Sequence, residues 1–237
     1  MSLRASDRLI AALDFTRLAT AMAVARQLRG VVGTVKVGSV LFTAAGPAVI
    51  ARMRSLGFAV MLDLKFIDIP TTVELSCRAA VHHRVAMLTV HTSGGAAMVE
   101  MAVRGVRDEA RRTRIPRPLV LGVTVLTSTA DGSSARIRSR VAELAALARR
   151  AGCDGVVASA QEAAALRRRF GPRLRIVCPG IRPAHTQPGD QRRVCTPAEA
   201  LRRGADFLVV GRPITAAAHP ALAAQCIIEE MEARDRC

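Results

Sequence analysis

The sequence predicts an α/β protein with the (β/α)8 TIM barrel fold, in which eight parallel strands form a closed barrel. Eight short apolar segments alternate with longer amphipathic segments, which is the pattern of a parallel sheet covered by helices. No linker interrupts the series, and the length of 237 residues is close to the roughly 250 typical of one barrel. We therefore expect residues 1–237 to form a single domain, a closed barrel rather than an open sheet.

Each expected strand is a short run rich in aliphatic residues, as buried parallel strands are. These runs are residues 9–13, 34–37, 59–62, 86–90, 119–124, 155–158, 175–178 and 207–210. The expected helices repeat their apolar residues at helical spacing. They are residues 18–28, 48–56, 72–81, 96–112, 138–151, 160–170, 197–203 and 220–233.

The composition points to a cytoplasmic protein that does not interact with membranes. Half of the residues are hydrophobic, so a large core can be buried. No apolar run reaches the roughly 18 residues that a membrane span needs, and residues 1–8 lack the apolar core of a signal peptide. The six cysteines are scattered without a C-x-x-C pair, as is typical of reduced cytosolic thiols.

The formal net charge of +16 raises the question of a nucleic-acid partner. The arginines are spread along the chain, however, and the densest runs, residues 111–114 and 167–169, lie at the ends of expected helices, where cations favour the helix dipole. There is also no Tyr or Trp to stack on bases. We expect no nucleic-acid partner and, instead, an anionic small-molecule substrate. The pair His82-His83 has no further ligand at metal-binding spacing and is interpreted as a helix end.

Lysine is almost absent: of 35 basic residues, only Lys36 and Lys65 are not arginine. Arginine holds its proton permanently, whereas lysine can give its proton away. Both lysines follow apolar, strand-like runs, where the active site of a barrel is built. This placement predicts a site of proton transfer. The alternative is that an arginine-rich sequence kept two lysines by chance.

Charged residues of alternating sign gather at the ends of the second and third expected strands: Lys36, Asp63, Lys65 and Asp68. Asp63 and Lys65 are two positions apart and therefore point to the same side of a strand. Charges at buried strand ends are costly unless they are paired. We expect the four to pack together and to hold Lys65 charged and oriented. A buried ion-pair network without chemistry is the alternative.

The ends of the seventh and eighth expected strands predict a phosphate site. Gly211 and Arg212 follow an apolar strand and precede a helix, and backbone N–H groups with a guanidinium group suit a phosphate dianion. The loop of residues 179–194 carries Arg182 and Gln191. Its length and its position over the site are typical of a lid.

Taken in order, these motifs resemble the orotidine 5′-phosphate decarboxylase family over nearly the whole chain. The signature Asp63-x-Lys65-x-x-Asp68-Ile69-Pro70 is the most specific. The other motifs are Leu13-Asp14, Lys36-Val37-Gly38, Val123-Thr124-Val125-Leu126-Thr127-Ser128, Pro179-Gly180-Ile181-Arg182-Pro183, Gly189-Asp190-Gln191 and Val210-Gly211-Arg212-Pro213. The chain departs from the family at Ile67, usually His, and at Thr71, usually Asn.

The resemblance implies decarboxylation of orotidine 5′-monophosphate to uridine 5′-monophosphate and CO2, the last step of de novo UMP biosynthesis, without a metal or an organic cofactor. It implies that Lys65 protonates C6 of the pyrimidine, that Asp63 lies near the departing carboxylate, and that Lys36 and Asp14 contact the ribose. It also implies a homodimer with shared active sites. The other residues implied to take part in substrate binding are Thr127 and Ser128, which meet the pyrimidine or hold its loop, Pro179, and Arg182, Gln191, Gly211 and Arg212, which grip the phosphate. Asp68, Ile69, Pro70 and Thr72 are implied to reach into the neighbouring subunit's site.

Two other functions stay open. Sugar-phosphate lyases of the 3-keto-gulonate-6-phosphate decarboxylase and hexulose-phosphate synthase type share the D-x-K-x-x-D signature, but they need Mg²⁺ and place a glutamate ligand at the end of the second strand. Here that position holds Lys36, which would repel a metal. A barrel that binds nucleotides or nucleic acid without catalysis would leave the lysine–aspartate set unexplained.

Overall fold

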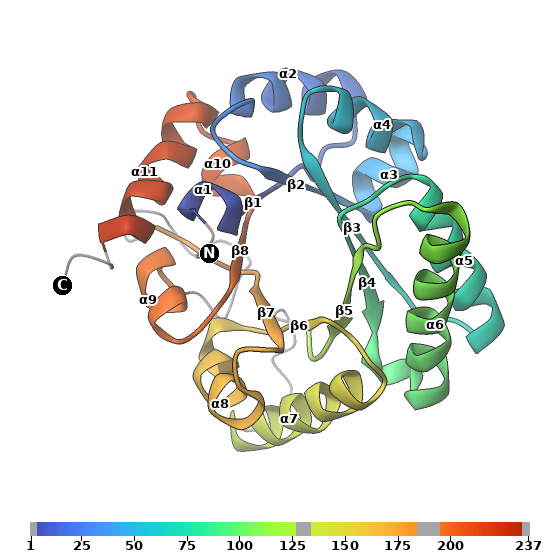
Figure 1. The fold of residues 1–237 in the computed structure, drawn as a ribbon. Coiled ribbons are helices and arrows are strands. Elements are labelled where there is room, and N and C mark those ends of the chain that lie inside the picture. Colours follow the sequence, from blue (N-terminus) through green and yellow to red (C-terminus); the bar gives the residue numbers. More distant parts are fainter. Residues whose placement is uncertain (1–3, 127–133, 184–194, 234–237) are drawn as a thin grey trace.

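Eight parallel strands close into a barrel, and helices surround it (Figure 1). The computed structural model describes residues 4–126, 134–183 and 195–233. Strand order follows the chain, and the last strand pairs with the first. The strands are β1 (Leu9–Ala12), β2 (Thr34–Gly38), β3 (Ala59–Phe66), β4 (Met87–His91), β5 (Leu119–Val123), β6 (Gly155–Val157), β7 (Arg175–Cys178) and β8 (Phe207–Val210). The predicted fold class is confirmed.

All eight expected helices are present: α2 (Leu18–Leu28), α4 (Ala48–Ser55), α5 (Pro70–His82), α6 (Ala96–Thr113), α7 (Ser134–Arg150), α8 (Ala160–Phe170), α9 (Pro197–Arg202) and α11 (Pro220–Ala233). Helix α5 begins two residues before the expected start, because Pro70 takes the first helical position, where its missing N–H is harmless. The helix expected at Arg212 is α10 (Arg212–Thr215), and three short elements were not predicted: α1 (Ala5–Arg8), α3 (Ser39–Ala45) and the 3₁₀ turn η1 (Thr92–Gly94). They are too short to show a helical period.

Strand β3 is longer and less regular than expected. The prediction ended it at Leu62, but it continues to Phe66. Its pairing with β4 shifts on the way: Leu62 lies opposite Leu88, and Phe66 lies opposite Val90. Four steps along β3 therefore match two along β4, which is a bulge. This bulge extends the charged end of the strand to the mouth of the barrel.

The core has two layers, which follow from the alternation of side chains along each strand. In β1, Leu9 and Ala11 face the helices, whereas Ile10 and Ala12 face the barrel axis. The cluster inside the barrel consists of Ile10, Ala12, Met61, Met87, Leu121, Val177, Phe207 and Val209. These side chains fill the barrel, and the upper members form the floor of the cavity described below.

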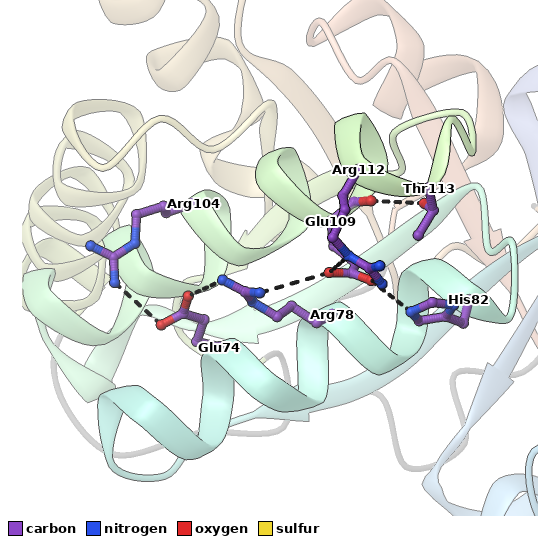
Figure 2. A network of polar contacts seen from close by, with 7 residues as sticks. All are labelled: Glu74, Arg78, His82, Arg104, Glu109, Arg112 and Thr113. Carbon is purple, nitrogen blue, oxygen red and sulfur yellow. Dashed lines mark hydrogen bonds and ion pairs between the residues drawn. The ribbon is translucent and has the colours of Figure 1, made fainter.

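Helices α5 and α6 lie side by side and are joined by an ion-pair network (Figure 2). Glu109 is 4% exposed, and it contacts Arg112, Arg78 and the His82 ring, whose Nε2 is 2.7 Å from Glu109 Oε1. Glu74 accepts hydrogen bonds from Arg78 at 2.9 Å and from Arg104 at 3.3 Å. The network holds α5 in place, and the segment that carries Asp68 leads directly into this helix. The expectation that His82 lies at a helix end is confirmed.

Within the described parts of the chain, no helix has both the length and the apolar character to span a membrane.

Candidate active site

A cavity of about 470 Å³ opens at the carboxyl ends of the strands, within the size range of small-molecule sites. Apolar side chains from the inside of the barrel, among them Ala12, Met61 and Val209, form its floor. Its charged lining comes from two sets of residues on different strand ends. One set is Asp14, Lys36, Asp63 and Lys65, and the other is Arg182 and Arg212. The cavity therefore lies where the sequence predicted a site.

The first set forms a row of alternating charge. Lys36 Nζ is 2.8 Å from Asp14 Oδ1 and 3.7 Å from Asp63 Oδ2, and Lys65 Nζ is 2.9 Å from the same Asp63 oxygen. The side chains of Lys36 and Asp63 are only 10% and 11% exposed. Charges buried to this extent need partners, and here each has one of opposite sign. Lys65 is the more accessible lysine, with 38% of its side chain exposed, so its ammonium group is available to a bound molecule.

Strand β2 places Lys36 in this row, and Gly38 leaves room for it. Lys36 lies in register with Ala12 of β1 and Met61 of β3, so its side chain starts from the interior layer of the barrel. Gly38 is two positions further and faces the same side. A Cβ atom on Gly38 would lie 2.8 Å from Lys36 Nζ and 2.9 Å from Asp14 Oδ1. The glycine is thus part of the site, a role that the sequence reasoning did not assign to it.

Asp68 does not join the row within one chain, and the expectation that all four charges pack together is wrong in this respect. Asp68 is exposed, and its Oδ1 accepts a hydrogen bond from its own neighbour, the Ile69 N–H, at 2.6 Å. The reason is that β3 ends at Phe66 and the chain then turns outward into α5. Ile69, Pro70 and Thr72 likewise contribute nothing to the lining of this chain's own cavity.

The second set has the features expected of an anion site. Arg182 is 9% exposed, and its Nη1 donates to the Ile181 carbonyl at 3.0 Å. Burial and, after it, the charge of Arg212 lower the pKa of Arg182 below the ordinary arginine value. Two arginines that line one cavity favour a bound anion there. Pro179 and Gly211 also line the cavity.

One expectation for the phosphate side of the cavity is corrected, and others concern residues that the structure does not describe. The helix expected after Gly211 is α10, a single turn that begins at Arg212 itself, so the guanidinium groups rather than a long helix dipole provide the positive charge. Thr127, Ser128 and Gln191 lie outside the described residues, as does most of the loop expected to act as a lid.

Two residues of β4 that the sequence reasoning missed lie beside the row. Thr89 is fully buried and contacts both Asp63 and Lys65. His91, at the end of the strand, accepts a hydrogen bond at Nδ1 from the Ser93 N–H at 3.3 Å. Burial lowers the pKa of His91, and the nearby positive charge of Lys65 adds to this effect. Neither residue belongs to a charged motif. The available sequence signal is their spacing: they follow Met87 by two and four residues, and therefore lie on the same interior face of the strand.

Across the described residues, no group of three or more His, Cys, Asp or Glu side chains is arranged to hold a metal ion. The described cysteines, Cys77, Cys153, Cys178, Cys195 and Cys226, are free thiols, and all but Cys226 are buried.

Comparison with known proteins agrees with this geometry. The model of the orotidine 5′-phosphate decarboxylase / HUMPS family matches residues 7–227. An orotidine 5′-phosphate decarboxylase of Moorella thermoacetica is 48% identical over 97% of this chain and 94% of its own length. One of Halorhodospira halophila is 47% identical over 98% and 99%. The crystal structure of an orotidine 5′-phosphate decarboxylase from Lactobacillus acidophilus superposes with a TM-score of 0.83, is 33% identical, and covers 95% of this chain and 99% of that one. The chain therefore belongs to the orotidine 5′-phosphate decarboxylase / HUMPS family.

Proposed function

We propose that the protein decarboxylates orotidine 5′-monophosphate to uridine 5′-monophosphate and CO2, the last step of de novo UMP biosynthesis. The observation that carries the proposal is the Asp63–Lys65 pair, 2.9 Å apart in a cavity that two arginines also line. The pair offers a proton donor, and the arginines offer an anchor for a phosphate at a distance from it. The curated decarboxylases that are 42–48% identical to this chain support the same reaction.

Lys65 has the properties that the chemical step needs. When the C6–carboxylate bond breaks, CO2 leaves and the electron pair stays on C6 of the pyrimidine. An ammonium group beside C6 stabilises this developing charge and then donates the proton that forms the C6–H bond. The contact with Asp63 holds the Lys65 Nζ at the cavity. Arginine would keep the positive charge but would be a far poorer proton donor.

Asp63 is held between the two lysines, so its carboxylate has a fixed place in the cavity. In the proposed complex it lies near the substrate carboxylate, where it positions Lys65 and brings two negative charges close together. Loss of CO2 removes this repulsion, which is a form of ground-state destabilisation. The same row extends to Lys36 and Asp14, and we assign these two to the ribose hydroxyls.

The phosphate is assigned to Arg182, Gly211 and Arg212, because guanidinium groups match phosphate oxygens in pairs. Pro179 borders this part of the cavity. Binding energy from a group remote from C6 can help the chemical step as well as affinity, because it fixes the pyrimidine against Lys65. We further assign Gln191 to the phosphate and Thr127 and Ser128 to the pyrimidine, from the family motifs alone.

We also propose a homodimer with shared active sites. Asp68 is exposed, and the apolar side chains of Ile67, Ile69 and Leu75 around it are 56%, 65% and 63% exposed. Exposed apolar groups gathered in one segment are typical of a surface that another subunit covers. In the dimer, Asp68 of the partner subunit would extend the charged row, and the partner's Ile69, Pro70 and Thr72 would border the cavity.

We propose that the reaction needs neither a metal nor an organic cofactor. We also propose that the protein has no nucleic-acid or membrane partner. Support for metal independence comes from the buried Lys36 ammonium, which occupies the strand end where a sugar-phosphate lyase of this superfamily holds its magnesium ligand. A cytoplasmic location is proposed as well, in keeping with the free thiols of the described cysteines.

The test is an assay of orotidine 5′-monophosphate absorbance with and without EDTA, with 3-keto-gulonate 6-phosphate as a second substrate. We expect the nucleotide to be converted to uridine 5′-monophosphate at a rate that EDTA does not change, and the sugar phosphate to be left intact. Activity that EDTA abolishes and Mg²⁺ restores, or turnover of the sugar phosphate alone, would assign the chain to the lyases instead. Binding of the nucleotide without turnover would support the non-catalytic barrel.

A further inference from the structure

We infer that Thr89 is a positioning residue, which sets the geometry of the Asp63–Lys65 pair without touching the substrate. This inference rests on the proposed function. Thr89 lies in β4, has no exposed surface, and is absent from the lining of the cavity. Its hydroxyl oxygen is 2.9 Å from the Lys65 backbone nitrogen and 3.0 Å from Asp63 Oδ1. One buried hydroxyl group therefore joins both members of the pair.

The direction of each hydrogen bond follows from the chemistry of the partners. An ionised carboxylate only accepts, and a backbone N–H only donates. The single hydroxyl proton of Thr89 must point to Asp63 Oδ1, and a lone pair of its oxygen must receive the Lys65 N–H. Both bonds are possible at once for a hydroxyl group, and neither is possible for an aliphatic side chain of the same shape.

The bulge in β3 explains why this contact is needed. Regular pairing with β4 stops at Leu62 and resumes at Phe66, and Thr89 lies between their partners, Leu88 and Val90. Lys65 has a φ of 49°, in the left-handed region that residues other than glycine rarely adopt. In this conformation its N–H donates to the Thr89 hydroxyl. Thr89 therefore stabilises the unusual backbone from which the Lys65 side chain starts.

The contact with Asp63 fixes the other half of the pair. One carboxylate oxygen of Asp63 accepts from Thr89, and the other accepts from Lys65 Nζ at 2.9 Å. With both oxygens held, the carboxylate cannot rotate about its terminal bond. The result is a rigid triangle of Thr89, Asp63 and Lys65, which presents the ammonium group to the cavity in one orientation. Such preorganisation matters because proton transfer requires close alignment, and a misplacement of roughly 1 Å can cost about 100-fold in rate.

The experiment compares Thr89→Val, which keeps the shape and removes the hydroxyl, with Thr89→Ser, which keeps the hydroxyl. We expect Thr89→Val to lower kcat for orotidine 5′-monophosphate by roughly 10- to 100-fold with KM changed by less than about threefold, because orientation is lost and the phosphate anchor is intact. Thr89→Ser should stay within about threefold of the wild type in kcat. In an Asp63→Asn background, Thr89→Val should have a smaller effect, since part of its action passes through Asp63.

Thr92→Val is the matched control. Thr92 is also fully buried, and its hydroxyl donates a hydrogen bond to the Val123 carbonyl at 2.6 Å rather than to the charged row. Thr92→Val should lose about as much thermal stability as Thr89→Val, but it should keep the kcat of the wild type. Equal kcat losses in Thr89→Val and Thr92→Val, an unchanged kcat in Thr89→Val, or no rescue by Thr89→Ser would overturn the inference.

A crystal structure of Thr89→Val separates this inference from the proposed function. It should show the Lys65 backbone leaving its left-handed conformation or the Asp63–Lys65 contact lengthening. If the triangle is unchanged, Thr89 has no positioning role, whatever the reaction is. If the triangle is lost but the wild type does not convert orotidine 5′-monophosphate, the positioning role stands and the assigned reaction is wrong.

Discussion

At the scale of single residues, Gly38 shows how the charged row limits the sequence around it. Its φ of −95° is open to any residue, so its backbone does not require glycine. The space around it does require glycine, because an added Cβ would lie under 3 Å from both Lys36 Nζ and Asp14 Oδ1. Both atoms are the ends of side chains that can move, so a substitution would disturb the ion pair rather than the fold.

We therefore expect Gly38→Ala to fold with nearly unchanged thermal stability but to lose about tenfold or more in kcat/KM for orotidine 5′-monophosphate, through misplacement of groups assigned to the ribose. Gly33→Ala is a suitable control. Its Cβ would lie 3.1 Å from the carboxylate of Asp7, outside the cavity. Loss of stability in Gly38→Ala without loss of kcat/KM would show that the glycine serves packing alone.

Arg212 should contribute mainly to recognition of the phosphate. We expect Arg212→Ala to weaken binding of uridine 5′-monophosphate by roughly 1.5–3 kcal/mol, the range of a hydrogen bond to a charged group. Binding of uridine, which lacks the phosphate, should hardly change. Calorimetric titration of both ligands into both proteins measures the difference. Equal losses for nucleotide and nucleoside would show that Arg212 supports the structure of the cavity instead.

The charged residues at the strand ends could be predicted from the sequence, but Thr89, their buried neutral neighbour, could not. Lys36, Asp63 and Lys65 were placed together from the sequence because burying charge requires partners. Thr89 gave no such signal, since threonine is an ordinary residue in a β-strand. Asp68 was expected in the same cluster, but its position depends on the path of the chain after β3, which residue types do not specify.

At the scale of secondary structure, the ends of elements were harder to predict than their existence. Strand β3 was expected to stop where its apolar run stops, at Leu62, but neighbouring strands extend it through Asp63 to Phe66. The bulge that carries Lys65 depends on pairing with β4, a contact between segments distant in sequence. Helix α3 was missed for a related reason: it starts directly after Gly38 and spans about two turns, which leaves too few residues for a periodic pattern.

The helix pair α5–α6 should make the protein sensitive to acid. Hydrogen bonds, chiefly from Arg112 and then from His82, lower the pKa of Glu109 to about 2 from an ordinary value of 4.5. A carboxylate whose pKa is lower in the folded state stabilises the fold above its ordinary pKa. This stabilisation is lost as the pH falls from about 5 towards 2.

We expect the melting temperature of the wild type to fall more steeply between pH 5 and pH 2 than that of Glu109→Gln, which cannot ionise at this position. Above pH 5 the variant should be less stable than the wild type, because Arg112, His82 and Arg78 would face a neutral partner. Scanning calorimetry across the pH series makes the comparison. Parallel curves for the two proteins would show that the Glu109 contacts add nothing to folding.

At the scale of the whole molecule, the number and order of units predicted the closed barrel, and the barrel then brought distant motifs to one cavity. Asp14 and Arg212 are almost 200 positions apart, yet both line it because β1 pairs with β8. Among the described residues of a single chain, no lysine or arginine pairs with the exposed Asp68, whose carboxylate accepts only from the Ile69 N–H. In the proposed dimer, each site combines Lys65 of one subunit with Asp68 of the partner subunit.

Mixing two inactive variants tests this arrangement. Lys65→Ala and Asp68→Ala should each be nearly inactive alone, because each lacks one residue in every site. After exchange of subunits, a mixed dimer holds one site with both defects and one intact site. Half of the dimers are mixed at random exchange, so roughly a quarter of the wild-type activity should return. If mass spectrometry of tagged subunits confirms exchange and no activity returns, Asp68 does not act across the interface.

The proposed proton transfer from Lys65 to C6 is tested by the turnover of Lys65→Arg with orotidine 5′-monophosphate. Lys65→Ala serves as the reference for complete loss of the donor, and circular dichroism of both variants checks the fold. We expect Lys65→Arg to be nearly as inactive as Lys65→Ala, with kcat lower than the wild type by roughly 100-fold or more, because charge is kept while proton donation is lost. A folded Lys65→Arg protein within about tenfold of the wild type, a barrier change of only ~1.4 kcal/mol, would show that Lys65 is not the proton donor.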